Sequence, residues 1–212
     1  MSAQAQNRRS LVDRLVGLAV VLGSFAKFFA FFVSFAAYSL WFGSWRFGLG
    51  FVLLILVHEL GHVAEARRQG LPVTLPTFIP FLGAFVTVQQ RNLAPWRSAL
   101  LSLAGPFVGG LAAAGVWAVG EARNATWLVV LANLGFLLNA FNLLPIGFLD
   151  GGTVWRAVTD TWQRPRIRFE NGVPVEAAAP ERERAVIVGA MYVLLAAALV
   201  GGLLATRHSG MI

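Results

Sequence analysis

The sequence predicts an all-α polytopic membrane protein with about five to six transmembrane helices and one short non-helical segment at membrane depth. Of its 212 residues, 57% are hydrophobic and only 13% are charged, whereas soluble domains carry about 25% charged residues. The apolar residues form runs of about 20, the length that crosses a bilayer. Basic residues flank these runs, which is the pattern that sets membrane topology.

The apolar runs predict the helices one by one. Arg67 and Arg68 close the second run, Gly70 is a suitable C-terminal stop, and Pro145 ends the fourth. The expected helices cover residues 18–42, 47–66, 97–120, 127–144 and 185–205. The length favours one membrane-embedded domain over residues 1–212.

Between the second and third helices the chain cannot continue as a helix, because Pro72, Pro76 and Pro80 interrupt it. The stretch 75–88 is nevertheless apolar and rich in Phe, Thr and Val. We therefore expect a re-entrant strand or loop near residues 72–90, which is tolerated at membrane depth only when buried or lining a polar cavity. An interfacial loop is the alternative.

The charges predict the orientation. Residues 153–184 form a polar, basic segment that we expect to begin as an amphipathic surface helix on the cytoplasmic side. A cytoplasmic N-terminus places most of the 17 Lys and Arg residues on that side, in a bacterial plasma membrane. The net charge of +7 does not indicate nucleic-acid binding, because the basic residues lie at the ends of apolar runs.

The second helix contains the motif His58-Glu59-Leu60-Gly61-His62. Residues four apart lie on one helix face, so His58 and His62 can bind a single metal ion. Glu59 lies about 100° around the helix, where the general base of a zinc hydrolase belongs. Ionisable groups inside a membrane helix are functional candidates. Two hydrogen-bonded core histidines are the alternative.

A catalytic zinc needs a third protein ligand, and without cysteines this must be a carboxylate. Asp150 and Glu65 are the candidates at suitable depth. We expect Asp150, because it lies in apolar surroundings beside two glycines, whereas Glu65 has Arg67 as a neighbour. Asn142 can donate to a substrate carbonyl or oxyanion, or it can cap backbone freed by Pro145.

The chain resembles the site-2 proteases, a family of intramembrane zinc metalloproteases. The resemblance covers about residues 47–152 and rests on the His58–His62 motif, Ala104-Gly105-Pro106, residues 78–85, and Asn142-Leu143-Leu144-Pro145 with Leu149-Asp150-Gly151.

The resemblance implies one Zn²⁺ held by His58, His62 and Asp150, with Glu59 as the base. It also implies cleavage inside the bilayer of the transmembrane segment of a single-pass membrane protein, as in regulated intramembrane proteolysis. We expect residues 78–88 to lie near the histidines and pair with an extended substrate by strand addition.

Two other functions use the same residues. A catalytically inactive protein could hold membrane segments without cutting them, and a metal transporter could use the same ligands. The sequence also leaves room for a homo-oligomer.

Overall fold

The computed structural model describes residues 23–81, 83–88, 93–163, 167–170, 173–176 and 180–209. The expectations for residues 1–22, namely the cytoplasmic N-terminus and the start of the first helix, lie outside these ranges. An N-terminal helix covers Gly23–Trp41. The later helices are α2 (Trp45–Arg68), α3 (Pro95–Ala122), α4 (Thr126–Asn142), α5 (Asp150–Gln163) and α6 (Pro180–Ser209).

Four described helices are long and apolar enough to cross a membrane, namely Gly23–Trp41, α2, α3 and the part of α6 from Arg182–His208. The apolar helix α4 has 17 residues, which lies at the lower limit for a transmembrane helix. The predicted all-α polytopic fold is therefore confirmed.

The described part of residues 72–90 is not helical, as the three prolines predict, and it contains a β-hairpin. Strands β1 (Thr77–Ile79) and β2 (Gly83–Phe85) pair antiparallel, with Thr77 opposite Phe85 and Ile79 opposite Gly83. A second antiparallel hairpin, β3 (Ile167–Glu170) with β4 (Val173–Glu176), lies in the basic segment between α5 and α6. This second hairpin was not predicted from the sequence.

The structure divides into two compact units. The first contains the described residues up to Val52 and the β1–β2 hairpin. Aromatic contacts hold it together: the ring centroids of Phe31 and Phe78 lie 5.2 Å apart, and those of Tyr38 and Phe51 lie 5.0 Å apart. Such edge-to-face pairs stabilise the packing of this unit.

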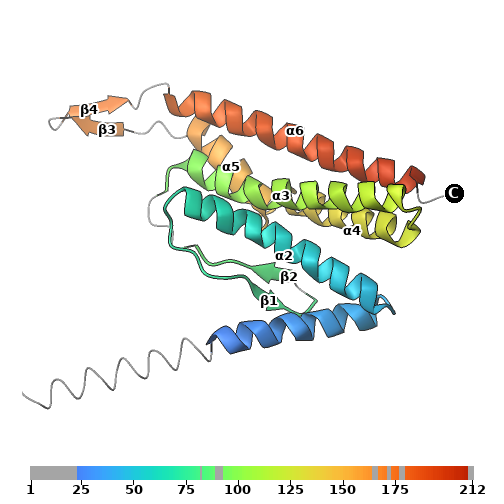
Figure 1. Cartoon of the computed structure of the whole chain (residues 1–212). Helices are drawn as coiled ribbons and strands as arrows, with labels where there is room; N and C mark the ends of the chain where they lie inside the picture. The colour runs from blue at the N-terminus through green and yellow to red at the C-terminus, as the bar shows by residue number, and fades with distance from the viewer. Residues whose placement is uncertain are drawn as a thin grey trace, which may run out of the picture. The chain divides into compact units, whose positions relative to one another are not determined.

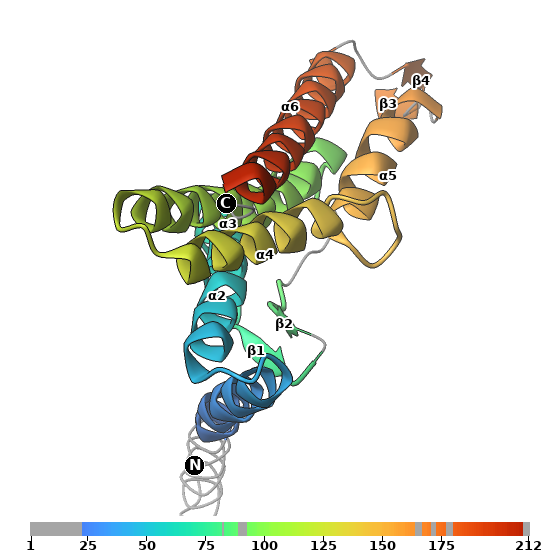
Figure 2. The ribbon, with the colours of Figure 1, turned by 90° about the vertical axis from the view of Figure 1, so that its right-hand side faces the viewer.

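The second unit contains the rest of α2 and helices α3 to α6. Helix α3 packs against α4, α5 and α6, and Figures 1 and 2 show α3, α4 and α6 side by side. The core between these helices is apolar. Its buried residues include Leu103, Phe136, Leu143, Val154 and Leu199.

Helices α2 and α3 approach each other closely at Gly61. A methyl group at this position would overlap the backbone carbonyl of Ala104. Small residues commonly permit such backbone contact between membrane helices. The glycine inside the histidine motif therefore sets the distance between α2 and α3.

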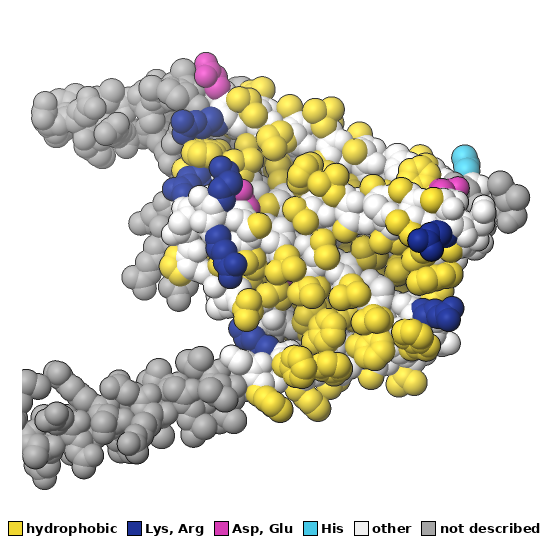
Figure 3. Space-filling view, in the orientation of Figure 1, with side chains coloured by type: hydrophobic (Ala, Val, Ile, Leu, Met, Phe, Trp, Pro, Cys, Tyr) yellow, Lys and Arg dark blue, Asp and Glu magenta, His cyan; other side chains and the backbone are white. Residues whose placement is uncertain are grey.

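Basic residues gather at one end of the second unit. Gln69, just after α2, bonds to Arg97 in the first turn of α3, and the Arg184 guanidinium of α6 lies 4.6 Å from the ring centroid of Trp96. Figure 3 shows hydrophobic side chains over α3 and α6 and basic side chains near their N-terminal ends. Arg123 and Arg207 lie at the opposite ends of α3 and α6. The N-terminal side carries more of the described basic residues, and we call it the positive end of the second unit.

Candidate metal centre

Helix α2 presents two imidazoles on one face, as the four-residue spacing requires. The Nε2 atoms of His58 and His62 lie 3.2 Å apart, and each lies 3.3 Å from Oδ2 of Asp150. His58 is only 4% exposed. Within the part of the chain that the structure describes, these three residues form the one His and carboxylate group with metal-binding spacing.

Asp150 reaches the histidines from the first residue of α5. The preceding loop is tight, because a methyl group on Gly151 would overlap the carbonyl of Leu143 and one on Gly152 would overlap that of Ile146. The Tyr192 hydroxyl of α6 donates to the Leu143 carbonyl at 2.5 Å. These contacts fix the loop and therefore the position of the carboxylate.

The proton of His62 can be placed from its partner. Its Nδ1 lies 2.8 Å from the carbonyl oxygen of Leu101 on α3, and a carbonyl can only accept a hydrogen bond. Nδ1 therefore carries the proton, and Nε2 presents a lone pair towards Asp150. Gly105 makes room for this ring, because a methyl group there would overlap the imidazole.

His58 has a side-chain partner instead. Its Nδ1 lies 2.8 Å from Oδ1 of Asn139 on α4, and the Asn139 amide nitrogen donates to the Gly135 carbonyl at 2.7 Å. Sequence reasoning did not select Asn139. It selected Asn142 on the same helix for another role, donation to a substrate carbonyl or oxyanion. The signal that separates them is the orientation of α4 towards α2, which one sequence does not contain.

The three converging atoms fit a zinc ion. Two imidazole lone pairs and a carboxylate oxygen repel one another unless a cation lies between them. Tetrahedral zinc with bonds of about 2.0–2.1 Å places its ligand atoms about 3.3 Å apart, which agrees with the spacing of 3.2 and 3.3 Å found here.

The charge of Asp150 also suits a metal ligand. Burial favours its neutral form, but His62 and His58, when they carry a proton on Nε2, donate to this carboxyl and outweigh burial, so they hold its pKa below its ordinary value. Asp150 is therefore the anionic member of the group. A cation between the three atoms would be partly neutralised by this carboxylate.

Glu59 lies beside the group and is only 6% exposed. Its carboxyl is within electrostatic reach of His58, His62 and Asp150. Glu59 is not one of the three converging residues. A buried carboxylate beside a metal site is suitably placed to exchange protons with a molecule bound at that site.

The structure does not bring Asn142 or Glu65 into the group of converging atoms. The Asn142 amide donates to the Leu138 carbonyl at 3.0 Å. The Glu65 carboxylate accepts hydrogen bonds from Arg68 at 2.6 and 2.7 Å and from Gln69 at 2.6 Å. The Glu65 carboxylate is thus held in a salt bridge with Arg68. The Asn142 contact lies within its own helix and does not involve the Phe141 carbonyl, which is the one that Pro145 leaves without its helical donor.

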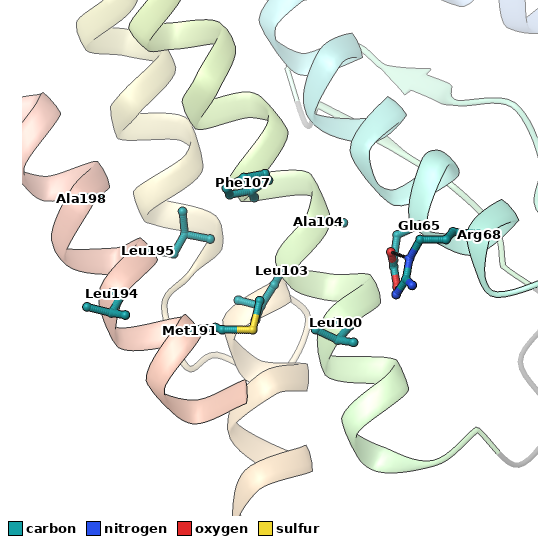
Figure 4. Close-up of a pocket in the computed structure, with 10 residues that line it drawn as sticks. All are labelled: Glu65, Arg68, Leu100, Leu103, Ala104, Phe107, Met191, Leu194, Leu195 and Ala198. Atoms are coloured by element: carbon teal, nitrogen blue, oxygen red, sulfur yellow. Dashed lines mark hydrogen bonds and ion pairs between the residues drawn. The ribbon is translucent and has the colours of Figure 1, made fainter. Parts of the chain in front are cut away.

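Glu65 instead lines an apolar groove of about 520 Å³ formed with α3 and α6. Figure 4 shows Glu65 and Arg68 paired at one side, facing apolar side chains such as Phe107 and Met191. The groove contains none of the three converging residues.

Comparisons with known proteins agree with this site. The model of Peptidase family M50 matches residues 46–125 and 121–175. A Synechocystis protein provisionally named zinc metalloprotease sll0528 is 30% identical over 128 residues, 56% of this chain and 33% of its own length. Rip3 of Mycobacterium tuberculosis, also provisionally named a zinc metalloprotease, is 30% identical over 172 residues, 74% of this chain and 42% of its own length.

A chloroplast protein of Arabidopsis thaliana, EGY1, carries a similar provisional name and is 31% identical over 150 residues, 49% of this chain and 27% of its own length. The chain thus spans between about a quarter and two fifths of the length of these curated relatives. The names of all three relatives contain zinc, which is the metal that fits the spacing of His58, His62 and Asp150. The family model covers more than half of the chain, which is an integral membrane protein that belongs to Peptidase family M50.

Proposed function

We propose that this chain is a zinc-dependent endopeptidase that cuts the transmembrane segment of a single-pass membrane protein. The observation that carries the proposal is the convergence of His58, His62 and Asp150, from an apolar helix and a distant loop, with the buried Glu59 beside them. Family membership supports peptidase chemistry.

The proposed roles follow from the donor atoms. Nε2 of His58, Nε2 of His62 and Oδ2 of Asp150 hold zinc, which when bound supplies Lewis-acid activation of water and of the scissile carbonyl. The Glu59 carboxylate accepts a proton from the attacking water and then gives that proton to the leaving amine. The burial of Glu59 keeps its carboxylate away from bulk water, which would compete for the same proton.

The substrate must unwind before it is cut, because the carbonyl of a helical residue is already hydrogen-bonded and sterically covered. Glycine or proline near the scissile bond lowers the cost of unwinding. Residues 78–88, which include β2, are proposed to pair with the extended substrate by strand addition. Asn142 is proposed to donate to the substrate carbonyl.

The positive end of the second unit supports a cytoplasmic orientation of the site. Arg67 and Arg68 end α2, and the histidines lie in the C-terminal half of this helix. Basic residues flanking transmembrane helices are retained on the cytoplasmic side. We therefore place the proposed centre towards the cytoplasmic face of a bacterial plasma membrane.

The test uses the full chain in lipid nanodiscs with a panel of single-pass substrates. Glu59→Gln should keep its zinc and lose cleavage, because it removes the proton acceptor and leaves the converging atoms intact. Glu65→Gln is the matched control on the same helix and should cleave normally. Equal cleavage by Glu59→Gln and the wild type would refute the proposed role of Glu59.

A further inference from the structure

Asn139 is a fully buried polar residue in an apolar helix, with an exposure of 0%. We infer that Asn139 is a positioning residue, which selects the Nε2 atom of His58 as the metal ligand by fixing the tautomer and the ring orientation. The inference rests on the proposed zinc site. It adds a residue outside the ligand set whose substitution weakens metal binding.

The orientation of the Asn139 amide is decided by Gly135. The Gly135 carbonyl, 2.7 Å away, can only accept a hydrogen bond, so the amide nitrogen must face it. The amide oxygen then faces His58 Nδ1 at 2.8 Å. An amide oxygen can only accept, so Nδ1 must carry the proton and Nε2 is left with its lone pair.

The two histidines differ in what fixes them. His62 donates to the backbone carbonyl of Leu101, which any residue at position 101 would supply. His58 depends on one particular side chain. Partners of this kind orient the ring and raise its basicity towards a metal, and their loss typically weakens metal binding about 10- to 100-fold.

Helix α3 leaves space for this arrangement. A methyl group on Gly109 would overlap the carboxamide of Asn139, just as one on Gly105 would overlap the His62 ring. The two glycines lie four residues apart and therefore share one face of α3. This face of α3 therefore accommodates the imidazole of His62 and the carboxamide of Asn139, which is the partner of His58.

The experiment measures zinc affinity of the full chain in nanodiscs by competition with a chelator. Asn139→Leu keeps the approximate volume and removes the acceptor, so its zinc dissociation constant should rise about 10- to 100-fold. Asn139→Asp keeps an acceptor oxygen and should stay much closer to the wild type. A leucine variant that binds zinc as tightly as the wild type would overturn the inference.

Asn133→Leu is the matched control on the same helix. Asn133 bonds to Thr206 and to the Leu203 carbonyl on α6 at 2.7 and 3.1 Å, so its loss removes helix contacts without touching His58. Its zinc affinity should equal that of the wild type. Equal weakening in the Asn133 and Asn139 variants would mean a purely structural effect and would contradict the inference.

A second measurement does not depend on how the variants fold. Nitrogen-15 spectra of the zinc-loaded wild type, labelled at histidine, should show His58 protonated at Nδ1 and bound through Nε2. The opposite assignment would overturn the inference even if the protein cleaves substrates. The two proposals can fail separately. If Glu59→Gln loses cleavage but Asn139→Leu binds zinc as tightly as the wild type, the proposed function is supported and this inference is refuted.

Discussion

Gly105 of α3 lies against the imidazole of His62 so closely that no methyl group fits between them. Gly105→Ala should therefore push the ring away from Asp150 and lower the zinc affinity. Gly115→Ala is the control on the same helix, because a methyl group there meets no other atom within 4 Å. It should bind zinc normally and be as stable as the wild type or slightly more so. Equal zinc affinity in the two variants would show that the space at Gly105 is not needed.

Tyr192→Phe tests the loop that presents Asp150. The variant loses the hydrogen bond to the Leu143 carbonyl, which should destabilise the fold by about 1 kcal/mol. Because Leu143 begins the loop before Asp150, zinc should also bind more weakly. Thermal unfolding with and without zinc measures both effects. An unchanged unfolding temperature in both states would contradict a clamping role.

Protons should compete with zinc for this site. Zinc binds neutral imidazoles and an ionised carboxylate. The protonated imidazoles hold the pKa of Asp150 below its ordinary value, so this carboxylate stays ionised in mild acid. The loss of zinc binding in mild acid is therefore expected to come from protonation of His58 and His62. The zinc dissociation constant should rise as the pH falls from 8 to 5.5, and zinc binding at low pH should release protons. Chelator competition across this range, with calorimetry in two buffers, measures both, and a constant affinity would argue against histidine ligands.

Asn142→Ala separates the two roles considered for this residue. Zinc content should equal that of the wild type, because the amide bonds to the Leu138 carbonyl and not to a converging residue. If Asn142 stabilises an oxyanion, kcat should fall about 100- to 1,000-fold. Unchanged kcat with a lower unfolding temperature would leave only the capping role.

The sequence predicted the placement of the three converging side chains where spacing alone decides the geometry. The four-residue separation of His58 and His62 places both rings on one face of any helix. The isolation of Asp150 between apolar residues and two glycines identified it as the carboxylate now found 3.3 Å from both rings. The three prolines after Gly70 likewise predicted the interruption that contains β1 and β2.

The sequence did not predict the partners of the histidines. His62 bonds to a backbone carbonyl. Every residue type has such a carbonyl, so the sequence does not indicate this partner. Asn139 and Asn142 lie three residues apart on α4, and only the rotation of α4 against α2 decides which one meets His58. The start of α5 at Asp150 was also unexpected, because Gly151 and Gly152 are poor helix formers and are needed for their fit against the loop carbonyls.

Zinc bound to Asp150→Asn, compared with Glu65→Gln, tests the central claim most directly. Both changes remove one acidic group, but only Asp150 lies within 3.3 Å of both imidazoles, whereas Glu65 is paired with Arg68. The Asp150 variant should purify with little zinc and the Glu65 variant with one zinc per chain. Full zinc in the Asp150 variant and its loss from the Glu65 variant would contradict the account.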